Sequence, residues 1–273
     1  MKQKNTREKK KWNNYLVAGL AMTGITLAIA VIGAFWTPYD ATAMSASLKF
    51  APPSFAHWFG TDNFGRDILS RVMEGVETTV VISVLVVAAS ALVGVLVGAL
   101  TGYFGGLIDE IMMRFTDAVN GFPSILLALV ILSVLGGGVE KLILALSIAF
   151  CPSYIRIVRS EFIKYRDADF IARARLMGVG WARILFVHIL PNIFSTFLVS
   201  IVIGFNNAIL AESGMSFLGI GVQPPAASLG KMLSDAQGYL SSAPWYALAP
   251  GLAIVWIVLG FSLLGEGIRR WNN

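Results

Sequence analysis

The chain has 273 residues, of which 56% are hydrophobic and only 14% are charged, and its mean hydropathy is +0.71. A soluble domain carries about 25% charged residues, so this composition excludes an ordinary soluble domain and indicates several membrane spans. The net charge of +5 does not indicate a nucleic-acid partner, because the basic residues flank apolar segments and form no basic surface with stacking aromatics. Cys151 is the only cysteine, so no disulfide can form within the chain.

Six apolar segments approach or reach the length that crosses a membrane, which is about 20 helical residues. In chain order they are 15–36, 76–103, 115–135, 142–157, 193–211 and 247–264. A backbone inside lipid must satisfy its own hydrogen bonds, so each segment is predicted to be a helix. The first apolar stretch exceeds the about 7–15 residues of a signal-peptide core, which predicts an uncleaved helix.

The sequence therefore predicts an all-α membrane protein with six transmembrane helices. Its parts are a basic N-terminus (1–14), a first helix (15–36), an extracytoplasmic segment (37–75), a five-helix core (76–268) with a cytoplasmic loop (158–191), and a tail (269–273). With the N-terminus inside, 16 of the 21 Lys and Arg residues fall on the cytoplasmic side. This excess predicts that both termini and the loop 158–191 are cytoplasmic.

Ionisable residues are scarce near the middle of the predicted spans. Glu77, Asp117, Arg156, Glu212 and Glu266 all fall at or near predicted ends. Carriers driven by protons or ions keep such groups inside the membrane because their mechanism needs them. A self-contained ion-coupled carrier or channel is therefore disfavoured, although backbone carbonyls can still bind sodium ions.

Catalytic and metal-binding patterns are absent from the sequence. His57 and His188 are predicted on opposite sides of the membrane, so they cannot share a metal site. The three glycines at 136–138 are not followed by the Lys and Ser or Thr of a phosphate-binding loop. We therefore expect no catalytic residue, metal or cofactor in this chain; a membrane enzyme is disfavoured, and any energy source lies on another chain.

The basic segment before the fifth span reads as a short helix followed by a break. Asp169 can cap a helix, and Ala172 and Ala174 are small enough for another surface to approach closely. Gly178 and Gly180 are predicted to end this helix through left-handed or otherwise unusual backbone angles, and Pro191 suits the start of the next span. The pattern predicts an exposed helix beneath the membrane that a cytoplasmic partner can contact; an ordinary amphipathic interfacial loop is the alternative.

This segment resembles the "EAA" loop of ABC importer permeases, in which a short coupling helix docks on an ATPase subunit. Ala172, Arg173, Ala174, Gly178 and Pro191 occupy the positions of that motif. The Glu and the first Ala of the motif are replaced by Ala172 and Arg173, which puts contacts assigned to that Glu in doubt.

Three further stretches are similar to the C-type permeases of peptide and nickel importers. They are "HWFGTDNFGRDILSR" (57–71), "GYFGGLIDEIMMRFTDAVNGFPSILLAL" (102–129) and "AESGMSFLGIGVQPPAASLGKML" (211–233). On these motifs the chain is identified as a member of that subfamily.

The resemblance implies a type I importer permease fold in the bacterial cytoplasmic (inner) membrane. It implies a second, homologous permease subunit, two ATP-binding cassette subunits that hold ATP and Mg²⁺, and an extracytoplasmic solute-binding protein. The chain would form half of a translocation pathway that works by alternating access, with membrane lipid around it. Short peptides and nickel or another metal chelate remain nearly equal candidates for the substrate.

Two groups of candidate residues lie at the predicted outer face. Asp62, Arg66 and Asp67 could contact the binding protein, and the alternative is a surface helix capped by Asp62. The second group is a candidate gate or pathway rim, where Gly214, Gly219, Gly221 and paired prolines are expected to break the fifth helix just outside the membrane; an ordinary re-entrant loop is the alternative. Its members are Glu212, Ser213, Met215 and Phe217, of which Glu212 is expected to face the pore.

Overall fold

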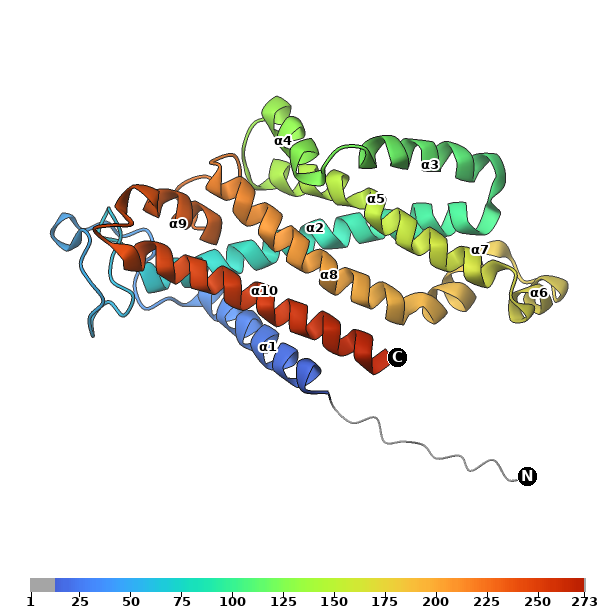
Figure 1. Ribbon diagram of the computed structural model, residues 1–273, viewed down its shortest axis with the longest axis horizontal. Coiled ribbons are helices and arrows are strands. Elements are labelled where there is room, and N and C mark those ends of the chain that lie inside the picture. The colour runs from blue at the N-terminus through green and yellow to red at the C-terminus, as the bar shows by residue number, and fades with distance from the viewer. Residues whose placement is uncertain (1–12, 273) are drawn as a thin grey trace, which may run out of the picture.

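Figure 1 shows the computed structural model, in which residues 13–272 are described. Within this range the chain is a bundle of helices without a β-strand; a single isolated bridge joins Thr61 and Asp67. The α-helices are α1 (Asn14–Phe35), α2 (Ile68–Phe104), α3 (Gly106–Asn120), α4 (Ser124–Leu135), α5 (Val139–Arg166), α6 (Asp169–Leu176), α7 (Trp181–Arg183), α8 (Leu190–Phe217), α9 (Leu229–Ala236) and α10 (Pro244–Asn272). Short 3₁₀ turns occupy Ala46–Leu48 and Gln237–Tyr239, and a π-helical stretch occupies Ile184–Ile189.

Among the described residues, five helical stretches are long and apolar enough to cross a membrane, namely α1, α2, α5, the stretch from α7 through α8, and α10. The pair α3 and α4 passes the same test together but is bent by 84°. Counting this pair as one broken span gives the six spans expected from the sequence.

The bent pair corrects the expectation of one continuous third helix over 115–135. Its break falls at Gly121–Pro123, because proline lacks an N–H and disfavours a helical conformation in the residue before it. Figure 1 shows α3 running along the bundle while α4 turns sharply across it, with Ala128 and Leu132 of α4 buried in the core that includes α5.

Three other predicted boundaries move because the helices are longer than their apolar cores. Helix α2 begins at Ile68, so the connecting segment expected to reach residue 75 ends at Asp67. Helix α5 continues to Arg166, so the loop expected from residue 158 begins nine residues later. Residues 269–272 continue helix α10 instead of forming a separate tail, whereas residues 1–12 of the expected basic N-terminus and Asn273 lie outside the described residues.

Small residues let neighbouring helices pack backbone to backbone. Gly94, Gly98 and Gly102 recur every four residues on α2 and face α5. A Cβ added at Gly98 would lie 2.7 Å from the carbonyl oxygen of Ile155. Such spacing of small residues favours close helix packing inside membranes, so this face of α2 fixes the position of α5.

The two ends of the bundle are formed by different elements. Figure 1 shows α6 and the C-terminal end of α10 toward one end, and α9 with the connecting segment 36–67 at the other. We call these the α6 end and the α9 end. One buried hydrophobic cluster includes Ile171 and Ala174 of α6, and a second lies among α1, α2, α9 and α10.

Candidate functional site

Helix α6 is anchored by two side chains and otherwise exposed. Ile171 and Ala174 are 0% and 4% exposed and belong to the hydrophobic core. They are three residues apart and therefore lie on one face of the helix. Between and beside them, Ala172, Arg173 and Arg175 are exposed. A single buried stripe thus holds this helix against the bundle, while Ala172, Arg173 and Arg175 remain exposed.

The end of α6 is set by Gly178, as expected, whereas Gly180 has an ordinary φ of −64° and does not take part in ending the helix, which corrects the prediction for it. The φ of +75° at Gly178 is a conformation that residues with a Cβ rarely adopt. The N–H of Gly178 donates to the carbonyl of Arg175 at 2.9 Å, and that of Val179 donates to the carbonyl of Ala174 at 3.0 Å. These bonds satisfy carbonyls at the end of the helix and turn the chain sharply toward α7.

Large apolar side chains project beside this turn. Leu176 is 88% exposed and Met177 is 76% exposed, and Trp181 is also exposed at the start of α7. Contiguous exposed apolar side chains are typical of interaction surfaces. Leu176 and Met177 lie outside the stretch Trp181–Phe217 that is long and apolar enough to cross a membrane, and we call these two exposed side chains the apolar crest of α6.

Contacts to the end of α2 fix α6 and α7 relative to the bundle. The guanidinium of Arg175 donates to the hydroxyl of Tyr103 at 3.2 Å and lies 4.9 Å from the centre of its ring. The rings of Phe104 and Trp181 are 5.7 Å apart. A displacement of α6 would therefore change these contacts with the end of α2 directly.

The structure brings together five of the six residues predicted for the coupling loop. Residues 169–178 form one compact unit, whereas Pro191 lies at the start of α8, beyond α7 and the π-helical stretch. The expected cap is not found, because Ala168 occupies the N-cap position and no side chain, including that of Asp169, caps α6. Ala174 is buried as an anchor, while Ala172 is exposed.

At the α9 end, a buried carboxylate organises the connection into α2. Asp62 is 0% exposed and accepts from the backbone N–H groups of Phe64 at 2.8 Å and Arg66 at 2.9 Å. Its other oxygen lies 2.6 Å from Nε of Arg66 and 3.7 Å from Nε of Arg71. Both guanidinium groups are themselves buried, so this carboxylate balances two charges that have little access to water.

The cap of α2 is Asp67 and not Asp62, which corrects the expected capping residue. Asp67 accepts from the N–H and the hydroxyl of Ser70, at 2.8 and 2.7 Å. Its second oxygen lies 2.9 Å from Nδ1 of His57. Asp62, Arg66 and Asp67 are therefore brought together, but all three are buried and hold the connecting segment in place. Their contact with a binding protein stays a prediction.

An open cavity lined by acidic residues lies beside this segment. Asp40, Glu74 and Glu77 line a cavity of about 470 Å³ between the end of α1 and the start of α2. The side-chain hydroxyl of Thr42, which donates to Asp40, holds the pKa of that exposed carboxyl below its usual value.

Glu212 is enclosed by its own subunit. The carboxylate is 0% exposed and accepts from Thr79 of α2 at 2.9 Å and from Ser216 at 2.8 Å. Ser213 donates at 3.3 Å. The expectation of a pore-facing carboxylate is therefore not met in this conformation: Glu212 ties α8 to α2.

The break after the fifth span also differs from the expectation. Gly214 remains inside α8, which continues to Phe217, and the turn comes at Gly219 with a φ of +81°. Ser213 and Met215 are buried and Phe217 is 36% exposed. Their role as a gate stays a prediction.

Several residues of these clusters were not anticipated. Ser70, Arg71, Thr79 and Ser216 take part in the buried polar contacts of the α9 end. Arg71 and Ser70 fall inside the "GRDILSR" stretch, so the motif contained a signal. Thr79 meets Glu212 across 133 positions of sequence, and no local pattern identifies such a pair.

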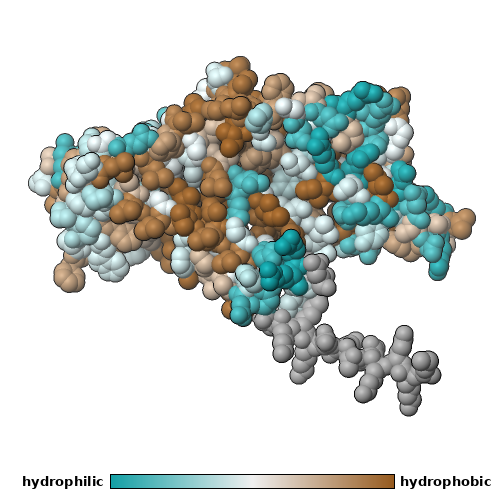
Figure 2. Space-filling view, in the orientation of Figure 1, coloured by the Kyte–Doolittle hydropathy of each residue, from teal (hydrophilic) through white to brown (hydrophobic). Residues whose placement is uncertain are grey.

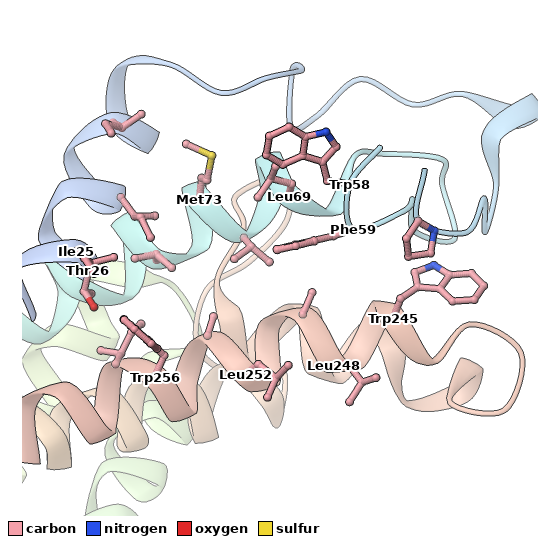
Figure 3. A pocket seen from close by; sticks show the side chains of 18 residues that line it. Ile25, Thr26, Trp58, Phe59, Leu69, Met73, Trp245, Leu248, Leu252 and Trp256 are labelled. Atoms are coloured by element: carbon pink, nitrogen blue, oxygen red, sulfur yellow. The ribbon is translucent and has the colours of Figure 1, made fainter. Parts of the chain in front are cut away.

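The residues that line a second cavity are almost entirely apolar. This cavity of about 530 Å³ lies between α1, α2 and α10, with Trp58, Phe59 and Trp245 at one end (Figure 3). Among residues 13–272, no group of three or more His, Cys, Asp or Glu side chains is arranged to hold a metal ion.

Comparison with known proteins places this geometry in a family. Residues 94–273 match the family described as the inner membrane component of binding-protein-dependent transport systems. The chain is 38% identical to the dipeptide transport system permease protein DppC of Alkalihalophilus pseudofirmus, over 95% of this chain and 85% of that protein. It is 34% identical to the protein of the same name from Haemophilus influenzae, over 95% and 90% of the two chains.

A relative with a different substrate in its name is similar to the same extent. The glutathione transport system permease protein GsiD of Pectobacterium atrosepticum is 35% identical, over 94% of this chain and 88% of that protein. The family match covers most of the chain, and the relatives cover nearly all of it. The chain therefore belongs to the family of inner membrane components of binding-protein-dependent transport systems, with the all-helical fold of the type I ABC importer permeases.

Proposed function

We propose that this chain is the permease subunit of an ATP-driven importer of short peptides. It forms half of the translocation pathway and docks one ATPase subunit through α6. The observation that carries the proposal is the arrangement of α6. Ile171 and Ala174 anchor this helix in the core, and Leu176 and Met177 beside it are exposed on the surface of the chain. The energy source is a partner, on which ATP and Mg²⁺ are bound.

The packing supports a direct transfer of motion from α6 to the spans. Ile171 and Ala174 share a core with residues of α2, α5 and α8, and Arg175 holds Tyr103 at the end of α2. A close-packed core moves in discrete steps instead of deforming gradually. A push on α6 by the ATPase would therefore tilt these spans together and switch the side from which the pathway opens.

The arrangement of charges supports an orientation in the bacterial cytoplasmic membrane. The α6 end carries Arg166, Arg173, Arg175 and Arg183, and the C-terminal end of α10 adds Arg269 and Arg270. Basic residues are retained on the cytoplasmic side. We therefore place the α6 end and both termini in the cytoplasm and the α9 end outside, where a solute-binding protein would deliver the substrate.

The substrate class rests on the relatives. Those named above are described as permeases for dipeptides and glutathione. All of these solutes contain peptide bonds, and this favours short peptides over a nickel chelate.

Uptake by proteoliposomes tests the proposal. The vesicles would hold this chain with its partner permease, the ATPase subunits and the binding protein, and would be offered labelled dipeptide or labelled nickel chelate. We expect dipeptide uptake that requires ATP on the side of the membrane that the ATPase subunits face. Uptake should be abolished when the ATPase subunits carry a substitution that prevents ATP hydrolysis. Uptake of the nickel chelate alone would overturn the substrate class, and uptake without ATP would overturn the coupling and favour an ion-coupled carrier.

A further inference from the structure

Helix α8 carries an exposed amide inside a span. Asn207 is exposed and makes no side-chain hydrogen bond to any other residue in the range 13–272. It precedes the end of α8 at Phe217 by about ten residues, or roughly 15 Å of helix. An amide without a partner in hydrocarbon costs several kcal/mol, about 4–8 on the strictest transfer scale. Something polar must therefore cover Asn207 in the membrane.

The same residue borders a groove between α8 and α10. The groove has a volume of about 470 Å³, and its polar lining consists of Asn206, Asn207, Ser262, Glu266 and Arg269. Figure 2 shows the corresponding face, where hydrophilic side chains interrupt a mostly hydrophobic surface over α8. Polar and ionisable residues inside membranes usually face a water-filled cavity or the interior of a bundle.

One side of the groove is held rigidly. The side-chain amide of Asn206 contacts the hydroxyl of Ser262 at 2.8 Å, and its NH₂ group can donate to the carbonyl of Val258 at 3.2 Å. These bonds join α8 to α10 beside Asn207. The amide of Asn206 is thus occupied within the chain, while that of Asn207 is free for a ligand.

The polar positions continue toward the α6 end. Glu266 lies 2.7 Å from Arg269 and 2.5 Å from Arg270, and both arginine side chains remain more than half exposed. A solute moving along the groove would pass from neutral amide and hydroxyl groups to a charged pair. This order suits a molecule with a polar backbone and charged ends.

We infer that this groove is a wall of the translocation pathway and that Asn207 binds the backbone of the transported peptide. This inference rests on the proposed function. A side-chain amide both donates and accepts, as a peptide group does, so it can bind peptides whatever their side chains. The groove volume also falls in the range of about 300–1,000 Å³ that is usual for small-ligand sites.

The second permease subunit is the other possible cover for Asn207. Tight packing of two helices in a membrane uses small residues that let the backbones approach. Here the groove is instead flanked by bulky side chains, including Val199, Ile203, Leu210 and Phe261. A hollow with amide, hydroxyl and charged groups among bulky apolar side chains therefore fits a small solute with polar groups better than a closely packed helix.

The test compares Asn207→Leu with Ser195→Leu in the complete complex. Ser195 is an exposed polar residue of the same helix that does not line the groove. We expect Asn207→Leu to raise the apparent KM for dipeptide uptake about tenfold, the effect of one lost hydrogen bond to the ligand. Basal ATP hydrolysis and co-purification of the second permease should stay unchanged, and Ser195→Leu should transport as the unsubstituted complex does.

A labelling experiment reports on the site without transport. A Cys151→Ser background removes the native thiol, and Asn207→Cys is then treated with a charged, water-soluble maleimide. We expect labelling that dipeptide slows, and no labelling of Val255→Cys, which is exposed on α10 but does not line the groove.

Each other outcome overturns the inference. Loss of the second permease from the Asn207→Leu complex would assign the groove to the subunit interface. An unchanged KM, or an Asn207→Cys thiol that does not react, would show that the groove is not part of the pathway. Failure of the unsubstituted complex to import dipeptide would instead refute the proposed function, so the two failures are distinguishable.

Discussion

At the α9 end, carboxylate and guanidinium groups are buried and form ion pairs with one another. At the α6 end, both charged and large apolar side chains are exposed. Asp62, Arg66 and Arg71 are each at most 6% exposed, while Leu176 and Met177 are at least 76% exposed. A buried polar network fixes one arrangement, because breaking it leaves charges without partners. Exposed apolar side chains have no such partners within their own chain, and clusters of them are typical of interaction surfaces. The comparison shows a buried, self-contained polar network at the α9 end, and it supports the proposal that the α6 end docks on another subunit.

The largest effect should come from removing the central carboxylate of the α9 end. Asp62→Ala leaves Arg66 and Arg71 buried without a counter-charge, which is expected to lower the free energy of unfolding by about 3–5 kcal/mol. Thermal unfolding of the purified complex in detergent measures the change. Asp62→Asn keeps an acceptor for the N–H of Phe64 and should lose less. Equal stability of both variants and the unsubstituted protein would show that this end is not held by the cluster.

The second effect concerns the tie between α8 and α2. Glu212→Ala removes the acceptor of the Thr79 and Ser216 hydroxyl groups, and both buried O–H donors lose their partner, at a cost of about 2–3 kcal/mol. Glu212→Gln preserves the volume and one acceptor oxygen and is the matched control. If Glu212 instead faces the pathway in the working complex, Glu212→Ala would change transport while leaving the unfolding temperature unaltered.

The third effect separates coupling from stability at the α6 end. Gly178 has a φ of +75° and Gly180 has a φ of −64°, and a Cβ added at either meets no atom within 4 Å. Gly178→Val is therefore strained by its backbone alone, by roughly 1–2 kcal/mol, and Gly180→Val is not. We expect Gly178→Val to lower ATP-dependent uptake strongly while the free energy of unfolding falls by no more than this strain, and Gly180→Val to transport normally. Equal uptake by the two variants would contradict a role for this turn.

The smallest effect is on the contact between α6 and α2. Arg175→Ala removes the hydrogen bond and the cation–π contact to Tyr103, worth about 0.5–1 kcal/mol at an exposed site. Arg173→Ala on the same helix removes no side-chain hydrogen bond, ion pair or ring contact within residues 13–272 and should leave the unfolding temperature unchanged. A larger loss for Arg173→Ala would show that α6 is anchored differently.

The sequence was sufficient for the spans and for the short helix, because both leave local signals. Apolar length predicts the spans, and Gly178 predicts the end of α6. The bend at 121–123 was not predicted, because the segment 115–135 is apolar over most of its length. Gly121 and Pro123 together are the local signal for a turn there. The hydrogen bonds of Glu212 were not predicted, because its partner Thr79 is distant in sequence. The sequence around an acidic residue near the end of a span does not distinguish a side chain that faces a pore from one that accepts from a buried hydroxyl group. Helix ends moved because polar residues can continue a helix beyond its apolar core.

The central claim is that α6 docks on the ATPase subunit, and site-specific cross-linking tests it most directly. In a Cys151→Ser background, Leu176→Cys and Phe55→Cys would each receive a photoreactive maleimide in the assembled complex. Phe55 is fully exposed at the opposite end of the molecule and is the matched control. We predict that irradiation joins Leu176→Cys to the ATPase subunit and leaves Phe55→Cys free of it. An ATPase adduct at Phe55→Cys, or none at Leu176→Cys, would contradict the account.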